Sequence, residues 1–183
     1  MYNKGFEVSP RSRDAIRDVA SKVRREIANF KGVDAPVFID IVEYLDIILP
    51  QVDHGFCLDI RSRQEMGSNH GLTIPREKRI CIREDVYEEA CNGRGEHRMT
   101  LAHELGHYRL HDAIIFAKRW EGKSSSLPQY KNSEWQADCF GGELLMDYDH
   151  IRQCLNIREI MKECGVSFEA ASYHFRLIKN EKG

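Results

Sequence analysis

The chain has 183 residues, a length that fits one domain with its own hydrophobic core. Hydrophobic residues make up 42% of it and charged residues 31%, and a net charge of -2 excludes a general attraction to nucleic acid or anionic membranes. The sequence has neither an apolar run approaching the ~18 residues of a membrane span nor the apolar segment of a signal peptide, so we expect a cytoplasmic protein.

The first predicted element is an amphipathic helix. Ser9-Pro10 resembles an N-cap followed by a proline at the first helical position, and Gly32 ends the segment. Its apolar face consists of Ile16, Val19, Ala20, Val23, Ile27 and Phe30. The other face carries Arg11, Arg13, Arg17, Arg24 and Arg25 among Asp14, Asp18 and Glu26. Because acids alternate with these arginines, we favour a solvated helix face over a nucleic-acid-binding arm.

A second helix is predicted after Pro36 and ends before Pro50. Its apolar side consists of Phe38, Ile41, Val42 and Leu45.

Three short strands and a short helix should follow. Residues 55–60, 70–75 and 79–83 are rich in β-formers and are bounded by Gly, Pro or charged residues. Residues 84–90 are typical of a short helix, which Asn92-Gly93 ends.

Residues 96–111 predict a helix that carries an H-E-x-x-H motif, His103 to His107. Two histidines four residues apart lie on one helix face, about 6 Å apart along the axis, and can chelate one Zn²⁺. Glu104 can then reach a water bound to that metal. On a helical wheel the polar residues form a single stripe within an apolar circumference, which indicates a buried helix facing a cleft. The stripe consists of Glu96, Thr100, His103, Glu104, His107 and His111.

A catalytic zinc takes three protein ligands, so a third must come from elsewhere. His111 is set aside because it lies one further turn along the same helix, about 6 Å further from the metal. The extended H-E-x-x-H-x-x-G-x-x-H pattern is also absent, because Leu110 and Ala113 replace its glycine and last histidine.

Glu134 is the preferred third ligand, with Asp138 four residues later on the same helix face. Asp138 would accept the remaining N–H of a ligand histidine, and the small Ala137 and Gly106 would let the two helices approach closely. One alternative is that both acids only complement a helix N-terminus. Another is that Asp138 is the direct ligand and Glu134 lies outside the metal's ligand set.

The rest of the chain is predicted to be helical. A loop at residues 122–128 precedes a helix that opens at residues 132–134 and runs through Leu145. Two short helices close the chain, hinged at Gly165, with Ser167 as N-cap of the last.

We therefore expect an α+β fold in a single domain, residues 1–183. A small three-stranded sheet would pack with the N-terminal helices, the helix of the motif, the Glu134 helix and the C-terminal helices. The parts are an N-terminal helix (1–35), a catalytic core (36–150) and a C-terminal helical pair (151–183).

The six cysteines form no C-x-x-C pair. Without an export signal, we expect reduced thiols, buried as small hydrophobic residues. They are Cys57, Cys81, Cys91, Cys139, Cys154 and Cys164.

Over residues 36–178 the chain resembles the ImmA/IrrE family of zincin metallopeptidases. The resemblance lies in H-E-L-G-H-Y-x-L-H, the later E-x-x-A-D-x-F and the segment from Ile80 to Tyr87. It implies a zincin-like fold and one catalytic zinc ion held by His103, His107 and Glu134, with Glu104 as catalytic acid/base. Gly141 departs from the family pattern, where alanine is usual, as does Asp147, where proline often follows Leu-Leu-Met.

By the same resemblance, the chain would be a site-specific regulatory protease of bacteria or phages. Its partner would be a helix-turn-helix repressor, whose cleavage switches on the genes that it silences. A further donor should steady the oxyanion, and the sequence does not choose among Tyr108, Tyr130, Tyr148, His150, Tyr173 and His174.

Two other classes of function remain open. Residues 159–171 resemble a helix-turn-helix, with Arg176 and Lys179 on the recognition helix, but their near charge balance favours a helical pair that caps the core. We therefore do not expect direct DNA binding. The other class is an inactive, zinc-stabilised interaction domain, in which Glu104 would have no use.

Overall fold

The computed structural model describes residues 5–111 and 127–180 and has the expected α+β fold. Its strands are β1 (Cys57–Arg61), β2 (Gly71–Ile74) and β3 (Arg79–Arg83). Its helices are α1 (Arg13–Lys31), α2 (Ile41–Glu43), α3 (Leu49–Val52), α4 (Arg63–Met66), α5 (Glu84–Cys91), α6 (Gly95–Leu110), α7 (Ser133–Leu145), α8 (Tyr148–Ile151), α9 (Ile157–Cys164) and α10 (Phe168–Asn180). A π-helical turn, η1 (Tyr44–Ile48), and two 3₁₀ turns, η2 (Pro75–Glu77) and η3 (Gln129–Lys131), complete the described elements. Most of the loop predicted at 122–128 lies outside the described residues.

The N-terminal helix starts later than predicted. Ser12, not Ser9, is the N-cap, and its hydroxyl accepts a hydrogen bond from the Ala15 amide. Residues 8–11 are instead held extended, because the amides of Val8 and Arg11 donate to carbonyls of residues 131 and 130. The predicted end is confirmed, since Gly32 adopts the left-handed conformation with φ 64°.

The basic face of α1 is less solvated than predicted. Arg24 is buried and donates to the Pro36 carbonyl. Arg13 and Arg17 both form ion pairs with Glu143, a buried carboxylate of α7. These arginines therefore fasten α1 to its neighbours, whereas Phe30, predicted in the apolar face, is 44% exposed.

The second predicted helix is found as one continuous helical segment, α2–η1–α3, that runs past Pro50. The prediction that it ends before Pro50 is wrong. A proline ring clashes with the carbonyl four residues earlier in a regular α-helix. Here the wider π-helical turn, in which the Leu49 amide bonds to the Tyr44 carbonyl, comes directly before Pro50.

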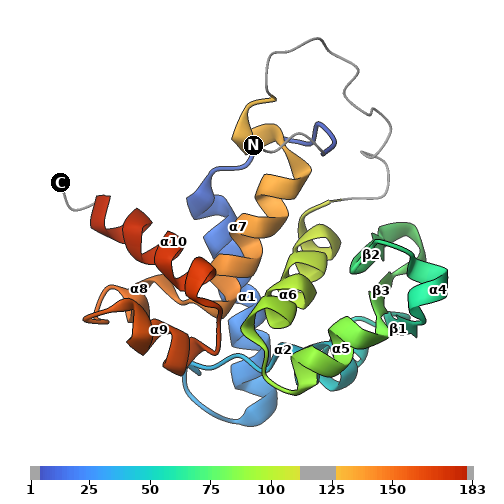
Figure 1. The fold of residues 1–183 in the computed structure, drawn as a ribbon, viewed down its shortest axis with the longest axis horizontal. Coiled ribbons are helices and arrows are strands. Elements are labelled where there is room, and N and C mark those ends of the chain that lie inside the picture. Colours follow the sequence, from blue (N-terminus) through green and yellow to red (C-terminus); the bar gives the residue numbers. More distant parts are fainter. Residues whose placement is uncertain (1–4, 112–126, 181–183) are drawn as a thin grey trace.

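The three predicted strands form one mixed sheet in the order β1-β3-β2. The central strand β3 pairs parallel to β1 and antiparallel to β2, with Ile80 opposite both Leu58 and Thr73. This arrangement leaves β2 at an edge, next to α6 (Figure 1). The edge strand therefore contributes to the region around the H-E-x-x-H motif.

Two long helices, α6 and α7, lie side by side at the centre of the molecule, as Figure 1 shows. The sheet lies beyond α6, and α10 packs on the other side, against α7. A Cβ atom at Gly106 would lie 2.9 Å from the Ala137 carbonyl oxygen, so the predicted close approach of the two helices is confirmed.

The C-terminal helices pack on the core through apolar side chains. Those buried are Ile151, Ile160, Cys164, Val166, Ala171 and Ile178. The predicted hinge at Gly165 and the N-cap at Ser167 are both confirmed. Buried Arg98 of α6 donates to the Cys164 and Gly165 carbonyls and so holds the end of α9. Through these contacts the two C-terminal helices, α9 and α10, cap the core.

The cysteines are less uniformly buried than expected. Cys81, Cys139 and Cys164 are buried, but Cys57 and Cys91 are exposed, and Cys154 is half-buried. None of the helices in the described part of the chain is long and apolar enough to cross a membrane.

Candidate metal centre

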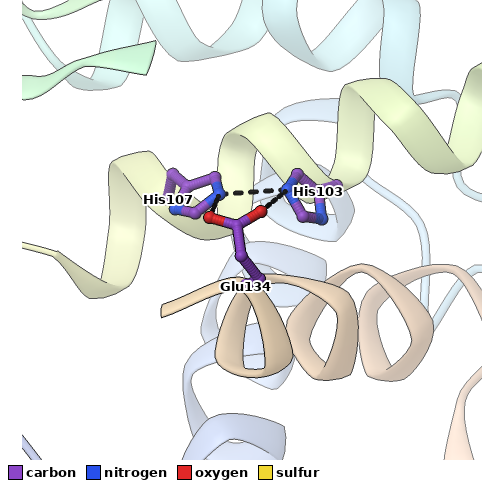
Figure 2. A group of neighbouring side chains, drawn as sticks. All are labelled: His103, His107 and Glu134. Atoms are coloured by element: carbon purple, nitrogen blue, oxygen red, sulfur yellow. Dashed lines mark hydrogen bonds and ion pairs between the residues drawn. The ribbon is translucent and has the colours of Figure 1, made fainter. Parts of the chain in front are cut away.

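The H-E-x-x-H motif lies on α6, and its two histidines, His103 and His107, face Glu134 in the first turn of α7 (Figure 2). The α7 helix begins where predicted because Asn132 caps it, accepting hydrogen bonds from the amides of Glu134 and Trp135. This cap places the Glu134 side chain opposite His103 and His107.

One donor atom from each of these three residues lies within 4.8 Å of the other two, close to the spacing around a tetrahedral zinc ion. The two Nε2 atoms of His103 and His107 are 3.0 Å apart. His103 Nε2 lies 3.5 Å from Glu134 Oε2, and His107 Nε2 lies 3.5 Å from the other oxygen, Oε1. Bonds of about 2.1 Å at tetrahedral angles put ligand atoms about 3.4 Å apart. The three predicted ligands are thus brought together, and their donor set fits one zinc ion.

Asp138 lies where its predicted role requires. Its carboxylate oxygen is 2.6 Å from His103 Nδ1, which donates to it. Since Nδ1 carries the hydrogen, the Nε2 lone pair of His103 points toward Glu134 and His107. Asp138 therefore orients the His103 ring, whereas the group of side chains close enough to hold a metal contains Glu134 and not Asp138.

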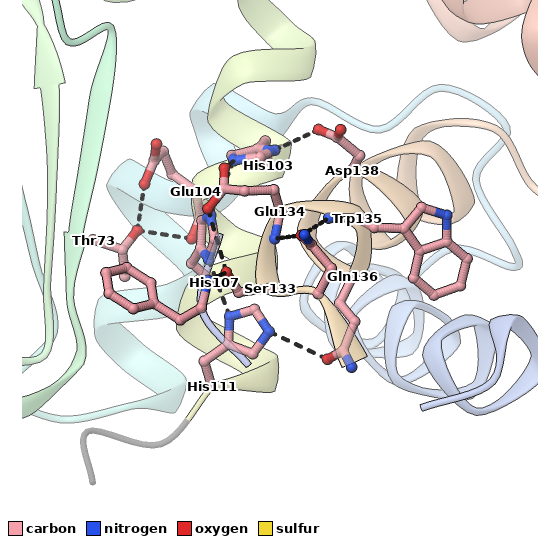
Figure 3. A network of polar contacts seen from close by, with 12 residues as sticks. Thr73, His103, Glu104, His107, His111, Ser133, Glu134, Trp135, Gln136 and Asp138 are labelled. Atoms are coloured by element: carbon pink, nitrogen blue, oxygen red, sulfur yellow. Dashed lines mark hydrogen bonds and ion pairs between the residues drawn. The ribbon is translucent and has the colours of Figure 1, made fainter. Parts of the chain in front are cut away.

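His107 is oriented by His111 and Gln136, a role that the sequence did not reveal for either residue. The side-chain amide of Gln136 donates to the carbonyls of Ser9 and Tyr130, so its oxygen is left to accept from His111 Nε2 at 3.2 Å (Figure 3). His111 Nδ1 can then accept from His107 Nδ1 at 3.0 Å. This chain of hydrogen bonds leaves the Nε2 lone pair of His107 free for a metal.

His111 lies on the far side of His107 from the three proposed ligands, and its predicted place on the helix was wrong. The α6 helix ends at Leu110, and His111 is extended, with φ -117° and ψ 112°. The spacing from His107 was visible in the sequence, whereas the helix end that turns this side chain toward His107 was not.

Glu104 is buried beside the sheet edge and contacts Thr73 of β2. The Thr73 hydroxyl lies 2.6 Å from Glu104 Oε2 and 2.9 Å from its backbone carbonyl oxygen. A Cβ atom at Gly71 would lie 2.5 Å from Glu104 Cγ, so a larger residue here would displace the Glu104 side chain. The edge strand thus fixes the Glu104 carboxylate. Nothing in the sequence indicated that Thr73 makes this contact.

The centre attracts positive charge. Burial lowers the pKa of His103, but hydrogen bonds to Asp138 and Glu134 outweigh it and raise that pKa to about 10. Burial raises the pKa of Glu134, but its contacts with both histidines leave the pKa well below its usual value. Burial and the neighbouring His107 lower the pKa of His111 to about 3, which keeps it neutral and able to accept a hydrogen bond. A proton or a metal cation at Nε2 of His103 meets the same negative field.

A cleft of about 540 Å³ opens onto the centre. Its lining includes His70 and Gly71 at the start of β2, Glu96 and His103 on α6, and Glu169 on α10. None of the described residues that line it is a lysine or arginine, and none is among the six candidate oxyanion donors. The polar stripe predicted for α6 therefore faces a cleft through Glu96, Thr100, His103 and Glu104.

Comparison with known proteins shows the fold and the family of the chain. A solved structure described as a Mycobacterium tuberculosis transcriptional regulator has 15% sequence identity and a TM-score of 0.52, over 87% of this chain and 46% of that chain. The chain thus spans less than half of that protein, and the likeness concerns the fold. No curated protein sequence matches the chain. The model of the peptidase family described as the IrrE N-terminal-like domain matches residues 58–176, and the chain belongs to this family.

Proposed function

We propose that the chain is a zinc-dependent endopeptidase that cleaves a regulatory protein. One observation carries the proposal: donor atoms of His103, His107 and Glu134 lie within 4.8 Å of one another, and His103 and the buried Glu104 beside it line a cleft.

His103, His107 and Glu134 would hold the metal. A zinc ion so held makes water more acidic and polarises a carbonyl group. Asp138 and the His111–Gln136 pair keep the imidazoles in the tautomers that present Nε2.

Glu104 would move the proton. Thr73 occupies its Oε2, which leaves Oε1 for a water molecule. Glu104 takes one proton from that water as the water oxygen bonds to the scissile carbonyl carbon. It then gives the proton to the amine nitrogen as the C–N bond breaks, a role worth typically 10²–10⁴-fold in rate.

The substrate we propose is a helix-turn-helix repressor. The resemblance to ImmA/IrrE proteins suggests it, and the similar solved structure is itself described as a transcriptional regulator. The cleft adds an electrostatic argument, because its described lining includes Glu96, Asp138 and Glu169 but no basic side chain except histidine. A basic, DNA-binding segment would complement such a cleft.

An inactive, zinc-stabilised domain is the alternative that the geometry favours less. A structural zinc site closes with a fourth protein ligand and needs no general base. Here Glu104 is buried next to the proposed ligands, Thr73 of β2 holds its carboxylate, and the absence of a side chain at Gly71 leaves room for it.

The test is cleavage of the repressor encoded beside the gene for this chain. The zinc-loaded wild type should cut it at one site, and Glu104→Gln should bind zinc equally but cut at least ~10²-fold more slowly. Glu88→Gln, an exposed position on α5, is the matched control and should behave as the wild type. Equal cleavage by the wild type and Glu104→Gln would contradict the proposed role.

A further inference from the structure

A second group of metal-binding side chains lies in the C-terminal part of the chain. His150 belongs to α8, Cys154 to the turn after it, and Glu163 to α9. One donor atom from each lies within 4.8 Å of the other two. None of these elements contributes a residue to the centre formed by His103, His107 and Glu134.

The distances are close to those of a zinc site. His150 Nε2 lies 3.8 Å from Cys154 Sγ and 2.7 Å from Glu163 Oε2. A tetrahedral zinc ion places nitrogen and sulfur about 3.6 Å apart and nitrogen and oxygen about 3.4 Å apart. The thiol is thus already at ligand spacing, and Glu163 needs to withdraw by only about 0.7 Å.

The donors come from anchored positions. Asp147 caps α8 by accepting a hydrogen bond from the His150 amide at 3.0 Å. The Cys154 amide donates to the Ile151 carbonyl, and this bond shapes the turn. On α9, Glu163 lies next to the buried Cys164, so the backbone that carries it is fixed to the core.

Solvent can reach these three side chains, and a bound metal could hold the exposed turn beside them. The side chains of His150 and Glu163 are 24% and 39% exposed, so an ion could enter without unfolding. In the turn between the two helices, Leu155 is 82% exposed, so this side chain adds no apolar burial there.

We propose that His150, Cys154 and Glu163 form a second zinc site, which ties the turn after α8 to α9. Thiolate, imidazole and carboxylate together suit zinc, whereas Mg²⁺ and Ca²⁺ prefer oxygen ligands. Coordination releases the thiol proton of Cys154 to solvent, and His150 would carry its ring hydrogen on Nδ1 so that Nε2 can bind the metal. The site is independent of the proposed peptidase activity.

Cobalt(II) titration distinguishes the two centres, because only the second contains sulfur. The wild type, first freed of metal with a chelator, should develop the near-ultraviolet absorption of a thiolate–cobalt bond. Cys154→Ser should lose it, and Cys91→Ser, which removes an exposed thiol elsewhere, should keep it. Absence of the band from the wild type, or its persistence in Cys154→Ser, would overturn the proposal.

Zinc stoichiometry gives a second measurement that does not depend on the thiolate absorption band. After equilibrium dialysis the wild type should bind two zinc ions and Cys154→Ser one. Glu163→Gln, which keeps a partner for His150 but removes the charge, should weaken the second zinc at least about tenfold. Matching circular dichroism spectra of the metal-free proteins would show that both variants fold. One zinc in the wild type, or two tightly bound zinc ions in both variants, would refute the site.

Discussion

Each ligand histidine in the proposed catalytic centre is oriented by a different device. A carboxylate, Asp138, accepts the Nδ1 hydrogen of His103. A neutral histidine, His111, receives that of His107 and is itself fixed by Gln136. The second device depends on the two backbone carbonyls that set the orientation of the Gln136 amide.

At the residue scale, the hydrogen-bonded chain His107–His111–Gln136, here called the Gln136 relay, should affect the affinity for zinc. Gln136→Leu removes the oxygen that accepts from His111, so His111 no longer has a fixed tautomer. We expect zinc to bind about 10- to 100-fold more weakly in a chelator competition assay, the usual cost of losing an outer partner of a ligand. Gln51→Leu, at an exposed glutamine of α3, is the control. Unchanged zinc affinity in a folded Gln136→Leu protein would show that the relay has no role.

Two helical glycines at the α6–α7 contact should respond differently to alanine. At Gly106 the new Cβ would meet the backbone of Ala137 at 2.9 Å. At Gly141 the closest atom, at 3.2 Å, is the flexible Met99 Sδ, followed by the His103 amide nitrogen at 3.3 Å. We expect Gly106→Ala to lower the free energy of unfolding by about 1–3 kcal/mol. Gly141→Ala should change it by less than about 1 kcal/mol, because the helix gains propensity.

Urea denaturation of the two variants measures this difference. A larger loss of unfolding free energy in Gly141→Ala than in Gly106→Ala would contradict the predicted close contact at Gly106. A small effect at Gly141 would also explain how this chain departs from the alanine usual in its family without losing the centre.

Docking of α10 onto α7 should make the stability of the protein depend on pH. His174 is buried over Gly142, and Arg13, Arg17 and Glu143 face this region. Burial and the two arginines lower the pKa of His174 to about 3. Below pH ~6.5 the unfolded chain gains a proton at this position and the folded chain does not, so stability falls as the pH drops toward 3.

The contribution of His174 is measured by substitution. Between pH 6 and 4 the wild type should lose up to about 1.4 kcal/mol per pH unit through this residue, a loss that His174→Leu removes. His54→Leu, at an exposed histidine, should keep the wild-type slope. Parallel stability curves for the wild type and His174→Leu would contradict this assignment.

At the scale of elements, local patterns in the sequence predicted helices and strands well but not their ends. Strand β3 was predicted at its observed bounds, because charged residues flank a short apolar run. The start of α1 was not, since pairing of residues 8–11 with residues 130 and 131 overrides the Ser9-Pro10 cap signal. The predicted end of α6 was one residue too late. The contact between His111 and His107 was therefore not predicted.

The proposed ligands were predictable because spacing within a helix determines geometry. His103 with His107, and Glu134 with Asp138, are each four residues apart, and small residues at the contact predicted that the helices meet. Thr73 and Gln136 depend on contacts between distant segments, which periodicity does not encode.

For the molecule as a whole, the cleft's charge predicts substrate preference. Its lining includes two exposed carboxylates, Glu96 on α6 and Glu169 on α10. Replacing both by glutamine should raise KM several-fold for a basic substrate segment and leave kcat unchanged, because neither touches Glu104. The effect should shrink at high salt, which screens exposed charges. An unchanged KM would show that the cleft does not select substrates by charge.

The central claim is hydrolysis by a Glu104-dependent centre, and cleavage in water enriched in ¹⁸O tests it most directly. Mass spectrometry of the repressor fragments should find one ¹⁸O atom in the new C-terminal carboxylate with the zinc-loaded wild type. With zinc-loaded Glu104→Gln, almost no labelled fragment should form. Equal amounts of labelled fragment from the two proteins, or no fragment from the wild type with its cognate repressor, would contradict the account.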